Sequence, residues 1–282
     1  MAAKRTMRIA AQVLPGGARS YAQWRSAVVQ AEQLGADIIF GYDHLLFPDS
    51  QACDQNGRPS IVFEERMSAN FEGWTALSSW AEITTRAEIG LLVTNVGFRN
   101  ADLLADMART VDHISGGRLI LGLGSGWYEP EYDEYGFPFS SAATRVAVLA
   151  TALERIRARF AGLVPPPVRD IPILIGGAGE KQTLPLVARY ADIWHAAIGP
   201  EAFERKNDIL VQHAEAVGRD PSAIERAVSW TGLEDAERFT AAGVTLFNVV
   251  IQARSGYDMS PLKEAVEWRD WILRPGAYLP TS

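Results

Sequence analysis

The sequence is poor in cysteine and histidine, the residues that most often bind transition metals. Cys53 is the only cysteine among 282 residues, which excludes an intrachain disulfide and fits a reducing cytoplasm. The 4 histidines are dispersed and show no spacing of the His-x-x-Glu-His kind. We therefore expect a cytoplasmic protein without a structural or catalytic metal.

Long apolar runs and an excess of basic charge are also missing. No stretch approaches the roughly 18 apolar residues of a membrane span, and no apolar segment follows the charged start, so we expect neither a membrane protein nor a secretory signal. The 27 basic residues are scattered and outnumbered by 34 acidic ones, which gives a net charge of −7. This balance is not typical of nucleic-acid-binding proteins, so a small molecule is the expected partner.

Short β-branched, apolar runs alternate with helical patterns along the chain, as in repeated βα units. The runs are almost continuously apolar, which indicates parallel strands buried on both faces. We predict a single (β/α)8 barrel, the TIM-barrel fold, as one domain over residues 1–282, and keep an open doubly wound sheet as the alternative. The eight predicted strands are residues 8–14, 37–41, 87–94, 118–122, 171–176, 192–196, 226–231 and 244–251.

The helices between these strands carry clear boundary signals. The strongest apolar stripe covers residues 101–115, and Gly116 and Gly117 then end it. A similar stripe covers residues 21–34. Asp220 followed by Pro221 predicts an N-cap with proline at the first helical position.

Two segments are too long for plain βα connections, residues 45–71 and 127–141. Both follow strand ends, so in a barrel they are insertions at the carboxyl-terminal face, where binding and catalytic residues gather. The second segment is rich in aromatic residues, which suits a pocket wall or a subunit interface equally well. We place Trp127 and Tyr128 in the substrate pocket; the other aromatics are Tyr132, Tyr135, Phe137 and Phe139.

A glycine-rich run stands between the fifth strand and a helical pattern over residues 181–190. Its glycines can bring bare backbone N–H groups to an anion at the helix start, which predicts a phosphate site; a tight turn without ligand is the alternative. Lys181 can add a positive charge. The predicted phosphate-binding residues are Gly176, Gly177, Ala178 and Gly179.

A second glycine-rich run, residues 121–127, matches neither the dinucleotide-binding fingerprint nor the nucleophile elbow. Trp127 stands where the fingerprint needs glycine, and no serine has glycine two residues away on both sides. We interpret the run as a strand end whose missing side chains leave space for a flat ring, with Gly124, Ser125 and Gly126 beside the cofactor.

Two histidines follow strands at the predicted catalytic face. His44 comes directly after Asp43, where an imidazole can exchange a proton with substrate or hold a cofactor, its tautomer set by a neighbouring carboxylate. A histidine satisfied by local hydrogen bonds is the alternative. His195 ends the sixth strand and is assigned to the substrate pocket, whereas His113 and His213 lie on predicted helices and are expected to be structural.

Residues 88–100, 104–108 and 112–127 resemble the bacterial luciferase-like flavin oxidoreductases, and more narrowly their branch that uses the deazaflavin coenzyme F420. Residues 135–138, 172–181 and 188–194 extend the resemblance in the order that the family shows. The resemblance covers most of the chain and is strongest over residues 72–195. It implies a barrel fold, a flavin-type cofactor and a homodimer.

The resemblance also implies roles for single residues. Asp43 and His44 match an Asp-His pair of the F420-dependent sugar-phosphate dehydrogenases, in which the histidine transfers a proton beside the cofactor ring. The glycine-rich run at 176–179 matches the loop that holds the phosphate of the coenzyme. Four residues match a bulged strand end that supports the ring, often with a non-prolyl cis peptide, namely Leu91, Leu92, Val93 and Thr94.

The chain departs from those dehydrogenases at two positions. They carry a glutamate acid where Trp127 stands, so the resemblance does not extend to sugar-phosphate oxidation. Close relatives more often carry asparagine at the position of His195. Glu129 and Glu131 are candidates for the missing acid, although the sequence places neither carboxylate near the ring.

We expect an F420-dependent oxidoreductase that transfers hydride between the deazaflavin and a small alcohol, enone or imine, with His44 moving the proton. Lys181, Arg99 and Arg58 are candidate partners for the acidic tail of F420. One alternative is a monooxygenase that uses reduced flavin mononucleotide (FMN) and oxygen. A barrel that binds flavin without turnover is the alternative of another class.

Overall fold

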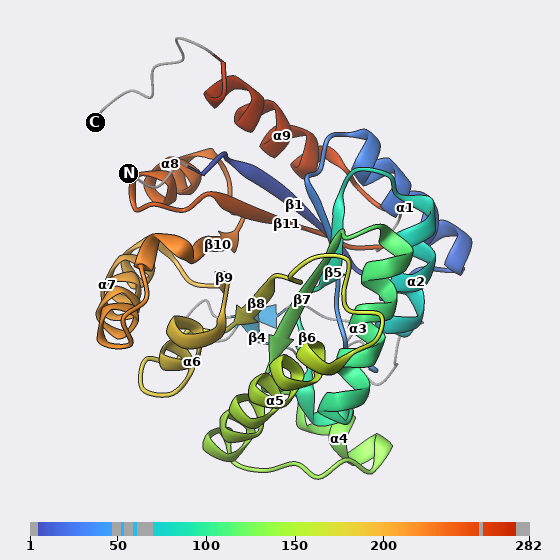
Figure 1. The fold of residues 1–282 in the computed structure, drawn as a ribbon. Helices are drawn as coiled ribbons and strands as arrows, with labels where there is room; N and C mark the ends of the chain where they lie inside the picture. The colour runs from blue at the N-terminus through green and yellow to red at the C-terminus, as the bar shows by residue number, and fades with distance from the viewer. Residues whose placement is uncertain (1–4, 47–51, 54–58, 61–69, 254–255, 275–282) are drawn as a thin grey trace.

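Eight parallel strands close into a barrel at the centre of the molecule (Figure 1). The computed structural model describes residues 5–46, 52–53, 59–60, 70–253 and 256–274. The strand order is β5-β2-β1-β11-β10-β9-β8-β7, and pairing of β5 with β7 closes the ring, so the predicted barrel is confirmed and the open sheet is excluded. The strands are β1 (Arg8–Val13), β2 (Ile38–Gly41), β5 (Glu88–Leu91), β7 (Leu119–Gly124), β8 (Ile173–Gly176), β9 (Ile193–Ala196), β10 (Glu225–Ser229) and β11 (Leu246–Ile251).

The third barrel strand contains a bulge. After β5 the chain passes through Leu92 and Val93, joined by a cis peptide bond, and continues as β6 (Thr94–Asn95). Five steps along this strand, from Ile89 to Thr94, pair with four steps on β7, from Leu119 to Leu123. The strand therefore holds one residue more than its neighbour, as a β-bulge requires.

Helices surround the barrel on its outer side (Figure 1). The predicted helix over residues 101–115 is confirmed, and Gly116 ends it with a φ of 66°. Asp220 caps only a single 3-10 turn, η2 (Pro221–Ala223), because β10 begins at Glu225. The helices are α1 (Tyr21–Gln33), α2 (Gly73–Ile83), α3 (Ala101–Ser115), α5 (Ala142–Gly162), α6 (Thr183–Tyr190), α7 (Pro200–Ala216), α8 (Leu233–Ala241) and α9 (Ser260–Ile272).

The two predicted insertions differ in how much of them the structure describes. The first contributes the antiparallel pair β3 (Ala52–Cys53) and β4 (Pro59–Ser60), and most of its other residues lie outside the described part. The second folds into the short helix α4 (Glu129–Tyr135). The 3-10 turn η1 (Val96–Phe98) leads from β6 toward α3. Within the described ranges, no helix is long and apolar enough to cross a membrane.

The barrel interior is filled by small and branched side chains such as Ala10, Ile120 and Ile193. Because side chains alternate along a strand, residues two positions further on also point inward, at the carboxyl-terminal end of the barrel. Several of those residues are polar or lack a side chain. They include Gln12, Gly122, Gly176, His195, Ser229 and Asn248.

The amino-terminal end of the barrel is closed by ion pairs. Arg8 bonds Glu88 at 2.5 Å and also pairs with Glu225, which is buried. Arg169 pairs with the second oxygen of Glu88 at 2.5 Å. Burial disfavours the charge of Arg8, but the interactions with the two glutamates outweigh it and raise the pKa of the guanidinium.

Candidate active site

A cavity of about 590 Å³ opens at the carboxyl ends of the barrel strands. Its floor includes Gln12, His195, Ser229 and the bulge residues Leu92 and Val93. Besides Glu131, the cavity brings together twelve residues that the sequence assigned to the site. These are Asp43, His44, Leu92, Val93, Gly124, Ser125, Gly126, Trp127, Gly176, Gly177, Ala178 and His195.

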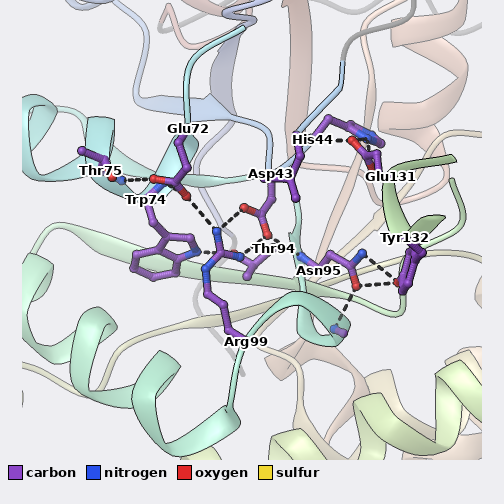
Figure 2. Close-up of polar contacts among 12 residues, drawn as sticks. Asp43, His44, Glu72, Trp74, Thr75, Thr94, Asn95, Arg99, Glu131 and Tyr132 are labelled. Atoms are coloured by element: carbon purple, nitrogen blue, oxygen red, sulfur yellow. Dashed lines mark hydrogen bonds and ion pairs between the residues drawn. The ribbon is translucent and has the colours of Figure 1, made fainter. Parts of the chain in front are cut away.

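His44 is held at this cavity by a buried carboxylate. Its Nδ1 lies 3.0 Å from Oε1 and 3.1 Å from Oε2 of Glu131 on α4 (Figure 2). The same Oε1 accepts the N–H groups of Leu45 at 2.7 Å and Leu46 at 3.0 Å, so Glu131 also fixes the chain after β2. A carboxylate at Nδ1 favours the tautomer with its proton there, which leaves the lone pair on Nε2.

Asp43 points away from His44 and binds Arg99. Two hydrogen bonds of 2.5 and 2.8 Å join the guanidinium to the Asp43 carboxylate, which also accepts the N–H of Asn95 at 2.9 Å (Figure 2). Arg99 further binds Glu72 at 2.8 Å. Burial raises the pKa of the Asp43 carboxyl, against the lowering effect of Arg99. With both oxygens engaged, Asp43 has the geometry of a residue that positions the strand ends.

The bulge is supported from inside the barrel by a chain of amides. Gln12 Nε2 donates to the Leu92 carbonyl at 2.8 Å, and Asn248 Nδ2 donates to Gln12 Oε1 at 3.0 Å. On the neighbouring strand a Cβ at Gly122 would collide with the Leu91 carbonyl. These contacts hold Leu92 and Val93 as a fixed apolar surface under the cavity.

The loop after β8 has the features of an anion site. Gly177 has a φ of 127°, and a Cβ on Gly179 would lie 2.8 Å from the Thr183 hydroxyl, so both positions need glycine. Gly177 N–H donates to the His195 carbonyl at 3.0 Å. The N–H groups of Ala178 and Gly179 have no acceptor among the described residues, which leaves two donors for a ligand oxygen.

His195 brings an uncharged imidazole to the cavity floor. Its Nε2 is buried and has no hydrogen-bond partner within the described residues. Burial lowers the pKa of His195 to about 4, so the ring is neutral at neutral pH. A buried nitrogen without a partner is costly, which favours a ligand that supplies one.

The sequence profile of the luciferase-like monooxygenase family matches residues 5–233. The chain belongs to the luciferase-like monooxygenase family. A phthiodiolone/phenolphthiodiolone dimycocerosates ketoreductase, found in Mycobacterium tuberculosis and Mycobacterium bovis, is 30% identical over 223 residues. The match covers 72% of this chain and 58% of the ketoreductase, so this chain spans less than two thirds of that relative.

Solved structures with the same fold include two coenzyme F420-dependent enzymes. An F420-dependent secondary alcohol dehydrogenase, in complex with an F420-acetone adduct, superposes with a TM-score of 0.73 at 16% identity, covering 87% of this chain and 93% of the other. The F420-dependent tetrahydromethanopterin reductase from Methanopyrus kandleri gives 0.68 at 17% identity, covering 93% and 97%. At these identities the likeness shows that the luciferase-like chain shares their barrel.

Five predicted site residues of this luciferase-like chain lie outside the cavity lining. Leu91 packs in the layer between strands and helices, and the Thr94 hydroxyl accepts Trp74 Nε1 at 3.2 Å, because the bulge turns only Leu92 and Val93 inward. Tyr128 is buried and does not belong to the cavity lining. Gly179 and Lys181 are exposed and do not line the cavity.

The interpretation of the strand-end glycines also changes. At Gly124 a Cβ would lie 2.5 Å from a methyl group of Val93, and at Gly126 it would meet the hydroxyl of Tyr132. The missing side chains therefore make room for the bulge and for α4, and Gly124, Ser125 and Gly126 reach the cavity as part of its wall.

Several residues of the site carry no signal in the sequence. Gln12, Asn248 and Asn95 are single amides whose partners lie on other elements of the fold. Arg99 was a candidate for the coenzyme tail, but Asp43 and Glu72 already bind its guanidinium. Of the two candidate acids, Glu131 places its carboxylate on His44 (Figure 2), and Glu129 is exposed. Within the described ranges, no cluster of His, Cys, Asp and Glu is arranged to hold a metal.

Proposed function

We propose that this luciferase-like protein is a coenzyme F420-dependent oxidoreductase that transfers hydride between the deazaflavin and a small organic substrate. The observation that carries the proposal is His44, which lies at the cavity with Nδ1 bound to the buried carboxylate of Glu131. The similarity to a ketoreductase and the fold shared with an F420-dependent secondary alcohol dehydrogenase support the same chemistry.

The cavity fits a flavin-type cofactor in three respects. Leu92 and Val93 give an apolar floor, and His195 carries an unpaired buried nitrogen. The N–H groups of Ala178, which lines the cavity, and of the adjacent Gly179, which does not, have no acceptor among the described residues and suit a phosphate. When bound, the deazaflavin supplies a ring carbon that gives or takes hydride. Flavin mononucleotide shares the ring and the phosphate and is the competing cofactor.

His44 is the proposed acid and base. Its Nε2 accepts the hydroxyl proton when an alcohol is oxidised, and the imidazolium returns a proton when a carbonyl or an imine is reduced. Glu131 stabilises that imidazolium and fixes the ring orientation. The described cavity lining contains neither lysine nor arginine, which favours an uncharged substrate over a sugar phosphate.

Titration of the purified protein with F420 and, separately, with FMN tests the proposal through quenching of tryptophan fluorescence. We expect F420 to bind more tightly and to support turnover with secondary alcohols or ketones. Preference for FMN would assign an oxygen-using monooxygenase, and binding without any turnover would assign a flavin-binding barrel.

The variant His44→Gln tests the catalytic residue. We expect it to bind F420 normally and to lose turnover by about 10²- to 10⁴-fold, the usual contribution of general acid-base catalysis. His113→Gln on α3 is the control, because that ring lies on a helix away from the cavity lining and hydrogen-bonds the Pro166 carbonyl. Full turnover in His44→Gln would refute the assignment.

A further inference from the structure

The three carbonyl groups of the loop at residues 177–179 are all held by donors from outside those residues. Trp194 Nε1 donates to Gly177 at 2.8 Å, Lys206 Nζ donates to Ala178 at 2.7 Å, and the first N–H groups of α6 donate to Gly179 at 2.9 Å. Because its three carbonyl oxygens already accept hydrogen bonds, the loop can present N–H groups to a ligand. This is the arrangement of an anion-binding nest.

Lys206 differs from the other donors because it is charged. It lies on α7, its side chain is only 15% exposed, and its Nζ also contacts Glu180 at 2.8 Å. Arg205 contacts the same Glu180 oxygen at 2.7 Å and is 60% exposed. Two cations thus share one carboxylate. A net positive charge therefore remains beside the N–H groups of Ala178 and Gly179, which have no acceptor among the described residues.

We propose that Lys206 is the positioning residue and counter-charge of the phosphate site. It binds the Ala178 carbonyl from outside the site, so that the N–H groups of Ala178 and Gly179 face the phosphate oxygens, and it offsets the negative charge of the bound phosphate. The inference rests on the proposed function, because the phosphate is that of the flavin-type cofactor. It replaces Lys181, the sequence neighbour of the loop, which is exposed.

The test compares ligands with and without the phosphate: FMN and riboflavin differ only by this group, whereas F420 and its deazaflavin alcohol differ by the phosphate together with the acidic tail. Binding of FMN and riboflavin, and of F420 and its phosphate-free deazaflavin alcohol, is measured by tryptophan quenching for the wild type and Lys206→Met. Loss of a charged hydrogen bond should weaken the phosphate-bearing ligand by about 10- to 100-fold and leave its phosphate-free partner within about twofold. Lys206→Arg should restore most of the lost affinity.

Arg205→Met is the matched control. It removes the other cation on Glu180 but breaks no contact with the loop carbonyls, and its charge is largely exposed to solvent, so we expect both members of each ligand pair to bind within about threefold of the wild type. A merely structural role of Lys206 would weaken both ligands of a pair equally. Equal loss, or no loss, in Lys206→Met would overturn the inference.

Inorganic phosphate separates this inference from the proposed function. Phosphate should raise the melting temperature of the wild type and of Arg205→Met, but not that of Lys206→Met. If the wild type bound neither cofactor while this pattern held, the proposed function would fail and the phosphate site would stand. Absence of any phosphate effect in the wild type would overturn the site.

Discussion

The proposed acid-base role of His44 depends on Glu131, a residue that is 87 positions away in the chain. Glu131 binds the ring nitrogen that faces away from the proposed substrate, and it does so from a buried position. A residue of this kind is expected to affect turnover more than cofactor binding, because it orients the imidazole and balances its charge.

Glu131→Gln should therefore lower kcat by about 10- to 100-fold with little change in the cofactor Kd. The amide keeps the size of the side chain but lacks the charge that stabilises the imidazolium. Glu129→Gln, two residues away and exposed, is the control and should behave as the wild type. Unchanged kcat in Glu131→Gln would show that His44 acts without its carboxylate.

His195 predicts a dependence of stability on pH. Burial lowers the pKa of His195 from its ordinary 6.5 to about 4, so between these values the unfolded chain binds a proton that the folded chain does not. Stability then rises with pH through this window and falls on acidification. We expect the unfolding free energy to drop by at most about 3 kcal/mol between pH 7 and pH 4, less for the solvated part of the ring.

Urea unfolding at both pH values measures this effect. In His195→Asn, which does not titrate, the unfolding free energies at pH 7 and pH 4 should lie closer together than in the wild type. If the two proteins showed the same pH dependence, other groups would be responsible for it.

At the scale of elements, the bulge between β5 and β6 shapes the cavity floor and requires glycine on the neighbouring strand. Gly124→Ala places a methyl group 2.5 Å from Val93, so Val93 must shift. We expect a loss of about 1 to 3 kcal/mol in stability and weaker cofactor binding. Gly162→Ala is the control, because a Cβ there meets nothing within 4 Å.

The elements were predictable from sequence, but their contacts were less so. The eight strands follow from local apolar runs, and α3 from an apolar stripe and its terminal glycines. The bulge cannot be read from such runs, because Leu91, Leu92, Val93 and Thr94 are similar in local pattern and only pairing with β7 decides which face inward. The pairs His44–Glu131 and Ala178–Lys206 join separate βα units, for which a single sequence gives no signal.

At the scale of the whole molecule, the cavity and the ion pairs around Arg8 lie at opposite ends of the barrel. Arg8→Met leaves the buried Glu225 without its main counter-charge, so we expect a loss of about 3 kcal/mol in stability. Cofactor affinity should not change. The exposed pair Arg159–Asp106 is the comparison, and Arg159→Met should leave the stability almost unchanged because solvent screens this pair.

Denaturant unfolding and cofactor titration on the same samples check this separation. Weakened cofactor binding in a folded Arg8→Met protein would contradict it. The expected homodimer is a further prediction at this scale, and sedimentation of the purified protein measures it directly.

The extra residue in the third strand has a consequence for how the sequence is compared with others. Before the bulge, alternate residues facing the barrel axis fall on even numbers, and after it Asn95 carries that orientation to an odd number. Inward-facing side chains therefore have even numbers before the bulge and odd numbers after it. Regular alternation through Val93 would turn Asn95 toward the helices and Thr94 toward the cavity, so a gapless alignment with an unbulged strand would assign every later side chain of that strand to the wrong face. Deleting Val93 would instead remove the bulge and leave Thr94 toward the helices and Asn95 toward the cavity.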